Sequence, residues 1–388
     1  MVEETRHQPT GRLATQPSVR AAALAQRLPL RAIVAWLALL LLILAIPMVF
    51  NTVWMNTINL ILVAIVAVTG LNLLVGYTGQ ISLGHAAFAM IGGFTVALMF
   101  DHWPGLRTSP WQLYLTLPAA GLSATLVGTL FGVPSLRVKG LYLAIATLAA
   151  HPILTWIVEH LYPELTVEGV PFSSLPVARP VLAIPGWTHT VRTDIDRYHL
   201  FIILAVLGIV IARNIVRTRV GRAFIAIRDN DIAAESSGIS LFKYKLLAFA
   251  VSSFYAGVAG AMLVYYFRTA TVESFTIARS IEYLAMAIIG GLGSLAGPVF
   301  GAIFIIVVPI LVRDRVVLPV ADTIPRLHQY FDFVREVLFG VLIIAFIILE
   351  PEGLYKLWLR LKAAVLHWIA TLTGNRTRPA GEGARESG

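Results

Sequence analysis

The chain has 388 residues, of which 57% are hydrophobic and 13% are charged, with a formal net charge of +9. Soluble globular chains carry roughly 25% charged residues, so this composition predicts an integral membrane protein. The cations gather in the tails and in a few loops, which is the positive-inside pattern of membrane proteins and argues against nucleic-acid binding. Cysteine is absent, so disulfides, thiol catalysis and cysteine metal sites are excluded.

Apolar segments follow one another along the chain and predict a bundle of helices. No Asp, Glu, Lys or Arg occurs between residues 32 and 100. Since one span needs about 20 apolar residues, this stretch crosses the bilayer more than once. Its third segment, 81–100, follows the helix-breaking GYTGQ and is either spanning or re-entrant. Other spans are predicted over residues 32–50, 57–75, 111–133, 140–159, 199–216 and 246–267.

A charge-free run from Tyr283 to Val312 is interrupted by GGLGSLAGP. A single helix over this run would be about 45 Å long at ~1.5 Å per residue, which exceeds the ~30 Å hydrocarbon core. Two shorter helices that meet at the glycines are therefore expected, followed by a last span over 333–350. The predicted fold class is an all-α, polytopic membrane helix bundle with about ten transmembrane or re-entrant segments.

The even number of segments places both tails on one side, and the distribution of cations makes that side the cytoplasm. The predicted order is a cytoplasmic N-terminal tail (1–31), a membrane domain (32–355) and a cytoplasmic C-terminal tail (356–388). Within the membrane domain, the mixed-charge connection 160–198 is expected outside and the basic segment 213–245 inside.

Segment 213–245 is the largest polar interruption predicted on the cytoplasmic side, with seven Lys/Arg and three acids. A helix over about 221–236, ended by Gly238, is expected. Small side chains at Ala233 and Ala234 would let this helix lie close to another protein. Composition leaves two interpretations open: a docking surface for a soluble partner, or a solvated loop that only sets topology.

The heptapeptide IAAESSG (232–238) resembles the cytoplasmic loop of ABC importer permeases, in which Glu-Ala-Ala is followed by three residues and Gly. Ala233, Ala234 and Gly238 match that pattern, whereas Ile232 stands where the pattern has Glu. The resemblance implies a loop that couples the membrane domain to ATPase subunits. The residues implied in this coupling are Gly221, Arg222, Arg228, Asp229, Asp231, Ala233, Ala234, Glu235 and Gly238.

Three ordered stretches resemble the branched-chain amino acid importer permeases of the LivM type. They are GYTGQISLGHAAFAMIGGF (76–94), the stretch 221–262 that begins GRAFIAIRDNDIAAESSG, and IEYLAMAIIGGLGSLAGPVFGA (281–302). The resemblance, which extends over about residues 35–355, implies a bacterial inner-membrane permease that forms half of a translocation path. It also implies a second homologous permease (LivH type), two cytoplasmic ATPase subunits (LivG and LivF types), an extracytoplasmic substrate-binding protein and membrane lipid as partners.

The sequence offers no chemistry for an energy source of its own. No GxxxxGK[ST] phosphate loop occurs, so the chain does not bind ATP by that route and hydrolysis is expected on partner subunits. The spans contain no nucleophile–base pair or paired carboxylates, so an enzyme is not expected, and no cofactor is implied. A secondary transporter or channel is the alternative from another class, although charge-free spans lack residues for ion coupling.

Three polar side chains in the first of these stretches, Gln80, Ser82 and His85, are expected at or within the membrane. Such groups are costly there and mark a possible translocation path, but they also occur as hydrogen-bonded packing residues. Because no Asp or Glu lies in this segment, neither a proton relay nor a metal site is supported.

Glycines at four-residue spacing, Gly293, Gly297 and Gly301, are expected to share one helical face that permits close helix packing. The substrate is less well defined, because LTVEGVPFSS (165–174) stands where LivM-like permeases are expected to have a TGG-containing stretch. The similar permeases of urea and short-amide importers are therefore the first alternative.

Overall fold

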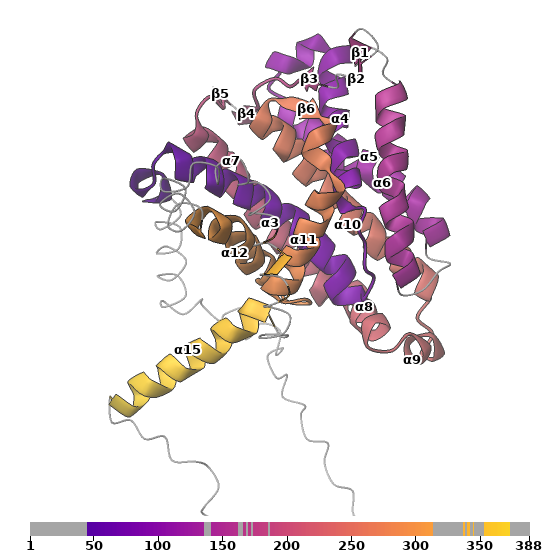
Figure 1. Ribbon diagram of the computed structural model, residues 1–388, viewed down its shortest axis with the longest axis vertical. Helices are drawn as coiled ribbons and strands as arrows, with labels where there is room; N and C mark the ends of the chain where they lie inside the picture. Colours follow the sequence, from indigo (N-terminus) through magenta and orange to yellow (C-terminus); the bar gives the residue numbers. More distant parts are fainter. Residues whose placement is uncertain are drawn as a thin grey trace, which may run out of the picture. The chain divides into compact units, whose positions relative to one another are not determined.

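The computed structural model describes residues 45–135, 141–161, 166–167, 170–171, 174–184, 187–312, 337, 340–341, 344 and 353–372. Its contacts define two units, Met1–Asn51 and Thr52–Gly388, and all the helices and strands labelled in Figure 1 belong to the second. The spans predicted over 32–50 and 333–350 lie mostly outside the described residues, as do the two terminal tails apart from a C-terminal helix.

The described residues are mainly helical, which confirms the predicted all-α membrane helix bundle, whereas the number of about ten segments stays a prediction. Among the described residues, five helices are long and apolar enough to cross a membrane, namely α3 (Thr52–Thr78), α5 (Gln112–Ser135), α6 (Leu141–Leu161), α7 (Asp194–Arg217) and α10 (Leu241–Phe267). The shorter α-helices are α4 (His85–His102), α8 (Arg219–Asp229), α9 (Asp231–Ser236), α11 (Ile277–Gly290), α12 (Gly297–Val312) and α15 (Gly353–Leu372).

Helix α3 is the core of the second unit. Every residue from Ile61 to Thr78 is buried, and α7, α10, α11 and α12 all pack against this helix. Such burial is possible because the helix carries no charge, and its hydroxyls bond to its own backbone. The Thr69 and Thr78 hydroxyls, for example, donate to carbonyls one turn earlier, at 2.6 and 2.5 Å. Packing against α3 therefore fixes the positions of α7, α10, α11 and α12 relative to one another.

The segment 81–100 does not form a helix of full length. After α3 the chain runs without helical structure from Gly79 to Gly84, and α4 begins at His85, whose Nε2 lies 2.9 Å from the Ala67 carbonyl in α3. Non-helical backbone at membrane depth must be covered by protein. The cover comes from α6 and α11: the Leu83 amide donates to Thr147 Oγ1 at 3.0 Å, and the α4 N-terminus is capped by Ser280.

Helices α4, α5 and α10 cross at glycines. A Cβ added at Gly92 of α4 would collide with the backbone of Gly257 in α10, and one added at Gly257 would collide with the Ala120 carbonyl in α5. Gly128 and Gly132 of α5 likewise face side chains of α10. These glycines allow three helices to approach to backbone contact, as small residues do in membrane bundles.

The run after Tyr283 is indeed two helices, α11 and α12, separated by residues 291–296, as the glycines predict. Gly297 and Gly301 lie on α12 and face Gly290 and Met286 of α11. Gly293 does not share that face: it lies in the connecting loop with a positive φ of 74°. The four-residue spacing is periodic in sequence, but the helix begins only at Gly297, so a common helical face cannot include Gly293.

The connection predicted outside contains short strands rather than only irregular chain. Three two-stranded antiparallel ladders form, and Figure 1 places β3 and β6 at the end of α10 opposite to α8 and α9. The strands are β1 (Thr166–Val167), β2 (Val170–Pro171), β3 (Ser174–Pro176), β4 (Val181–Ile184), β5 (Trp187–Thr190) and β6 (Thr269–Thr271). A capping box of Thr193 and Asp196 starts α7 at Asp194, earlier than the predicted residue 199.

The glycine crossing should control folding. Gly257→Val places a side chain against the Ala120 carbonyl, which cannot move without shifting α5, so we expect a loss of more than about 3 kcal/mol of stability. Gly105→Ala is the matched control, because nothing lies within 4 Å of an added Cβ there. Thermal unfolding and size-exclusion profiles of the purified variants measure the effect. A Gly257→Val protein as stable as Gly105→Ala contradicts the crossing.

Candidate functional site

The basic segment folds into two helices that connect α7 to α10. Only Thr218 separates α7 from α8, and its Oγ1 accepts from the Val220 amide at 3.2 Å as the cap of α8. Gly221 permits this sharp junction, because a Cβ there would collide with the backbone of Val216. The buried face of α8, which includes Phe224, packs against α3, α7 and α10. The α8–α9 segment is thus joined to the membrane helices on both sides.

The single helix expected over about 221–236 is interrupted, so that prediction is wrong in one respect. Asn230 has an extended backbone, with φ −163° and ψ 108°, and its side chain accepts from the Ala233 amide at 3.0 Å. Asn and Asp favour such caps over helix interiors, and Asn230 has an Asp on each side. The predicted stop at Gly238 is observed, with φ 82° just after α9.

The Arg228 side chain projects from α8 toward the end of α3. Its Nη1 donates to the Gly76 carbonyl at 3.0 Å, while Nε and Nη2 both donate to Asp229 Oδ1 at 3.1 Å. A Cβ added at Gly293 would lie 2.7 Å from Arg228 Nη1, and one at Gly79 would lie 3.5 Å from Arg228 Cγ. We call the set of Gly76, Gly79, Arg228 and Gly293 the Arg228 junction. Both Gly79 and Gly293 have positive φ, so the junction depends on glycine at these positions.

Asn72 holds the α11–α12 loop against the same end of α3. Its Nδ2 donates to the Ser294 carbonyl at 2.7 Å, and its Oδ1 accepts from the Gly293 amide at 3.0 Å. The Asn72 side chain is buried, and both ends of its amide are satisfied by one loop. Ser294 in turn closes the loop, because its Oγ accepts from the Gly297 amide at 2.9 Å.

The three stretches that carry the family resemblance therefore meet in space. Residues 76–94 contribute Gly76 and Gly79, residues 221–262 contribute Arg228, and residues 281–302 contribute Gly293. The Arg228–Gly76 bond of the junction joins positions 152 residues apart, and the neighbouring Gly293–Asn72 bond joins positions 221 residues apart. Sequence reasoning listed Arg228 among the residues of a coupling loop and missed its contacts with α3. Asn72 carried no sequence signal other than being a polar residue in a long apolar run.

Large apolar side chains of α9 and of the start of α10 are exposed to solvent. Ile232 is 76% exposed and Phe242, at the start of α10, is 53% exposed. A cleft of about 480 Å³ lies between these elements, lined by Glu235, Gly238, Ile239, Ser240, Leu241, Phe242 and Lys245. Asp231 is not free at this face, because its Oδ2 pairs with Lys245 Nζ at 2.9 Å and ties α9 to α10.

Some of the predicted coupling residues lie on the buried face of the α8–α9 segment, and others lie on its exposed face. Gly221 and Ala234 are buried against the membrane helices, and Arg228 and Asp231 bridge to neighbouring elements. The residues exposed at the outward surface are Arg222, Asp229, Ala233, Glu235 and Gly238.

The polar residues expected near a translocation path are all buried in the bundle. Gln80 Nε2 donates to Thr78 Oγ1 at 2.8 Å, and His85 makes an edge-on ring contact with Tyr283. Gln80 Oε1 and Ser82 Oγ have no hydrogen-bond partner among the described residues. His85 is thus held by packing and by the Ala67 carbonyl, whereas Gln80 and Ser82 keep unused polar atoms within the non-helical segment 79–84.

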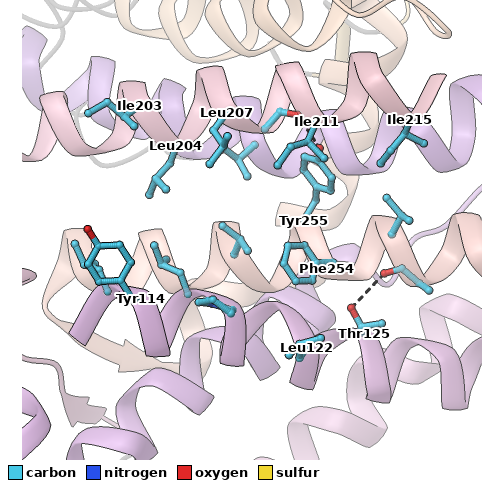
Figure 2. A pocket seen from close by; sticks show the side chains of 18 of the residues that line it. Tyr114, Leu122, Thr125, Ile203, Leu204, Leu207, Ile211, Ile215, Phe254 and Tyr255 are labelled. Atoms are coloured by element: carbon cyan, nitrogen blue, oxygen red, sulfur yellow. Dashed lines mark hydrogen bonds between the residues drawn. The ribbon is translucent and has the colours of Figure 1, made fainter. Parts of the chain in front are cut away.

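A second cavity, between α7 on one side and α5 and α10 on the other, is apolar (Figure 2). Its volume is about 740 Å³, and it is lined mainly by aliphatic and aromatic side chains. The hydroxyls of Thr125 and Tyr255 are already bonded to backbone carbonyls, the latter to Gly208 at 2.7 Å. No charged side chain lines the groove, so it is poorly suited to the two charges of a free amino acid.

Apolar helices long enough to cross a membrane, together with a polar helical segment that joins two of them, define this chain as a multi-spanning membrane protein of the permease class. The chain belongs to the family described as branched-chain amino acid transport system / permease component, whose family model matches residues 53–347. This result confirms the predicted LivM-type resemblance.

Curated relatives carry the same description. The chain is 30% identical over 336 residues to the LivM permease protein of the high-affinity branched-chain amino acid transport system of Escherichia coli K12, covering 82% of this chain and 73% of that protein. The LivM protein of Salmonella typhimurium LT2 is also 30% identical, over 337 residues, with the same coverage. A probable LivM permease of Methanocaldococcus jannaschii is 23% identical over 250 residues, which cover 62% of this chain and 68% of that protein. No solved structure matches the chain.

Removal of the Asn72 amide should loosen the α11–α12 loop. In Asn72→Ala the Gly293 amide and Ser294 carbonyl lose their buried partners, which should cost about 1–3 kcal/mol. We expect a lower melting temperature and faster hydrogen exchange at Gly293. Asn214→Ala, an exposed asparagine in α7, is the control and should change neither quantity. Equal exchange in both variants contradicts the role assigned to Asn72.

Proposed function

We propose that this chain is the permease subunit of an ABC importer and forms half of the translocation path for branched-chain or related amino acids. ATP hydrolysis on separate cytoplasmic subunits drives the cycle. The Arg228 junction is the observation that carries the proposal, because it connects the surface available to such subunits with two interruptions in the membrane helices. The family and its LivM relatives, which belong to branched-chain amino acid transport systems, support the substrate class.

The α8–α9 segment is the proposed contact for the ATPase. An ATPase side chain would bind over Ile232 and Phe242, whose exposed apolar surface is unusual at a solvated loop. Movement of α9 reaches α10 through the Asp231–Lys245 pair and reaches α3 through α8 and Arg228. A packed helix with such connections transmits movement as a rigid element.

The translocation path is proposed to pass the non-helical segment 79–84. Interrupted helices near the membrane centre commonly form transport sites, because their backbone groups and termini are available to a polar ligand. Gln80 and Ser82 retain unused polar atoms there, and the Arg228 junction lies at one end of the segment. His85 would act as a packing residue that positions the start of α4.

The proposed assembly contains a second homologous permease of the LivH type, two cytoplasmic ATPases of the LivG and LivF types, and an extracytoplasmic substrate-binding protein. The membrane domain 32–355 would lie in the inner membrane, with 160–198 outside and both tails, 1–31 and 356–388, in the cytoplasm. The seven cations of segment 213–245 support this orientation.

A urea or short-amide importer is the second candidate for the substrate. The observation that favours it is the stretch 165–174, which lacks the TGG pattern and includes the β1–β2 hairpin. Binding of leucine, other amino acids and urea by the associated receptor discriminates the two candidates. Leucine or isoleucine binding supports the first, and binding of urea alone supports the second.

Two substitutions should distinguish binding of the ATPase from coupling of ATP hydrolysis to transport. Ile232→Asp places a charge on the exposed α9 surface, so we expect at least about tenfold weaker ATPase association. Arg228→Gln leaves that surface intact but removes the charged bond to Gly76, so we expect assembly with ATP hydrolysis that drives little transport. Co-purification and transport in proteoliposomes measure the two effects.

Arg219→Gln is the matched control for Arg228→Gln, since it removes an exposed cation from the same helix that is not among the predicted coupling residues. It should preserve the ratio of substrate transported to ATP hydrolysed. Normal assembly in Ile232→Asp together with normal transport in Arg228→Gln would show that the α8–α9 segment does not couple the two activities.

A further inference from the structure

Four arginines surround one small cavity at the end of the molecule opposite to the α8–α9 segment. The cavity has a volume of about 140 Å³ and is lined by Arg179, Arg192, Arg197 and Arg268, together with Pro180, Val191 and Tyr265. Arg197 lies in the first turn of α7 and Arg268 directly follows α10, so both helices that lead to the α8–α9 segment contribute to the cavity. None of the lining residues is acidic.

The β4–β5 hairpin brings Arg179 and Arg192 together. Val181 pairs with Thr190, and the Val191 amide donates to the Pro180 carbonyl at 2.9 Å, which continues the register and places Arg179 opposite Arg192. Like charges directly opposite on paired strands are destabilising. Buried Gln112 of α5 nevertheless fixes this backbone, since it donates to the Arg179 carbonyl at 3.2 Å and accepts from the Val181 amide at 2.6 Å.

Arg197 is held rigidly at the edge of the cavity. Its Nη1 donates to the Tyr266 carbonyl at 2.9 Å, its guanidinium lies 5.4 Å from the centre of the Tyr266 ring, and Nη2 pairs with Asp194. The buried Nε of Arg197 has no acceptor among the described residues. One donor of a fixed guanidinium is therefore unused.

Arg268 has a left-handed backbone, with φ 61°, which no other non-glycine among the described residues adopts. Its carbonyl accepts from the Val177 amide at 2.9 Å, at the start of the β3–β6 pairing. A left-handed arginine costs free energy that the surrounding structure must offset, and such residues cluster at binding sites. The left-handed conformation ends α10 at Phe267, and the Arg268 side chain lines the cavity.

Three of the four arginines at this cavity have no acidic partner among the described residues. Arg197 pairs with Asp194, but Arg179, Arg192 and Arg268 make no ion pair among the described residues. Cations are disfavoured in short outer connections of membrane proteins. Three unpaired arginines around a preorganised cavity are thus complementary to a carboxylate, with which guanidinium forms bidentate hydrogen bonds.

We propose that this arginine cavity is the docking site for an acidic side chain presented by the extracytoplasmic substrate-binding protein. The inference rests on the proposed importer function and identifies the surface that such a receptor would contact. A free amino acid is a poorer occupant, because its ammonium would face several arginines and no lining carboxylate. An Asp or Glu on a protein surface presents the carboxylate alone. Its binding would bridge the ends of α7 and α10.

The test uses the complete complex in phosphatidylcholine nanodiscs and the substrate-binding protein of the same transport system, with leucine bound. In Arg179→Gln/Arg192→Gln we expect the Kd for the receptor to rise about tenfold or more and to become less sensitive to salt. Receptor-independent ATP hydrolysis should stay unchanged, which shows that the complex is folded. Arg107→Gln is the control, because Arg107 is an exposed outer arginine away from this cavity, and its Kd should equal that of the wild type.

An unchanged Kd in the double variant, with receptor-stimulated hydrolysis in the wild type, overturns this inference and leaves the importer function standing. A wild-type complex that no receptor stimulates overturns the importer function as well. If the double variant keeps its receptor affinity but retains less phosphatidylglycerol than the wild type when both are purified from the same mixed-lipid membranes, the cavity binds a lipid phosphate and the docking proposal is wrong.

Discussion

The position of α8 relative to α3 depends on one charged hydrogen bond, which Arg228 donates to the Gly76 carbonyl at the end of the buried helix α3. The last carbonyls of a helix lack intrahelical donors and carry its negative dipole end. The Gly79 and Gln80 amides turn back to Val75 and Leu74, so the carbonyl of Gly76 is open and accepts from Arg228. Hydrogen bonds to charged groups contribute about 1.5–3 kcal/mol, and partial exposure of the guanidinium places this one near the lower value. The bond fixes α8 relative to α3.

The same two helices connect the α8–α9 segment with the arginine cavity. Helix α7 carries Arg197 in its first turn and continues through Thr218 into α8, while α10 carries Lys245 of the Asp231–Lys245 pair in its first turns and ends directly before Arg268. Both pack against α3, although they make few contacts with each other, and the apolar groove of Figure 2 lies between them. A displacement of α7 relative to α10 would therefore change the geometry of both the α8–α9 segment and the arginine cavity. Reciprocal coupling between a receptor and an ATPase requires such a connection.

Local features were accessible from sequence, and long-range contacts were not. The apolar runs predicted the described spans, and the glycines at 290–298 predicted the α11–α12 break, because hydropathy and backbone freedom act within a few residues. The cap at Asn230 was missed, since a side-chain bond to the Ala233 amide outweighed the continuous helix. The contacts of Arg228 with Gly76 and of Asn72 with the loop join distant residues. The three motif stretches indicated the family, but nothing in the sequence indicated that Gly76, Arg228 and Gly293 meet in space.

The central claim is that α8 and the α11–α12 loop move as one body with the end of α3. The chain has no native cysteine, so in the double variant Arg222→Cys/Leu292→Cys it carries spin labels at these two positions alone. Arg222 lies in α8 and Leu292 in the α11–α12 loop, and both are exposed. The distance distribution between the labels should be measured in the assembled complex without nucleotide and with ATP bound. The same narrow distribution in both states is the predicted result, and a distance that shifts or broadens when ATP binds would contradict it.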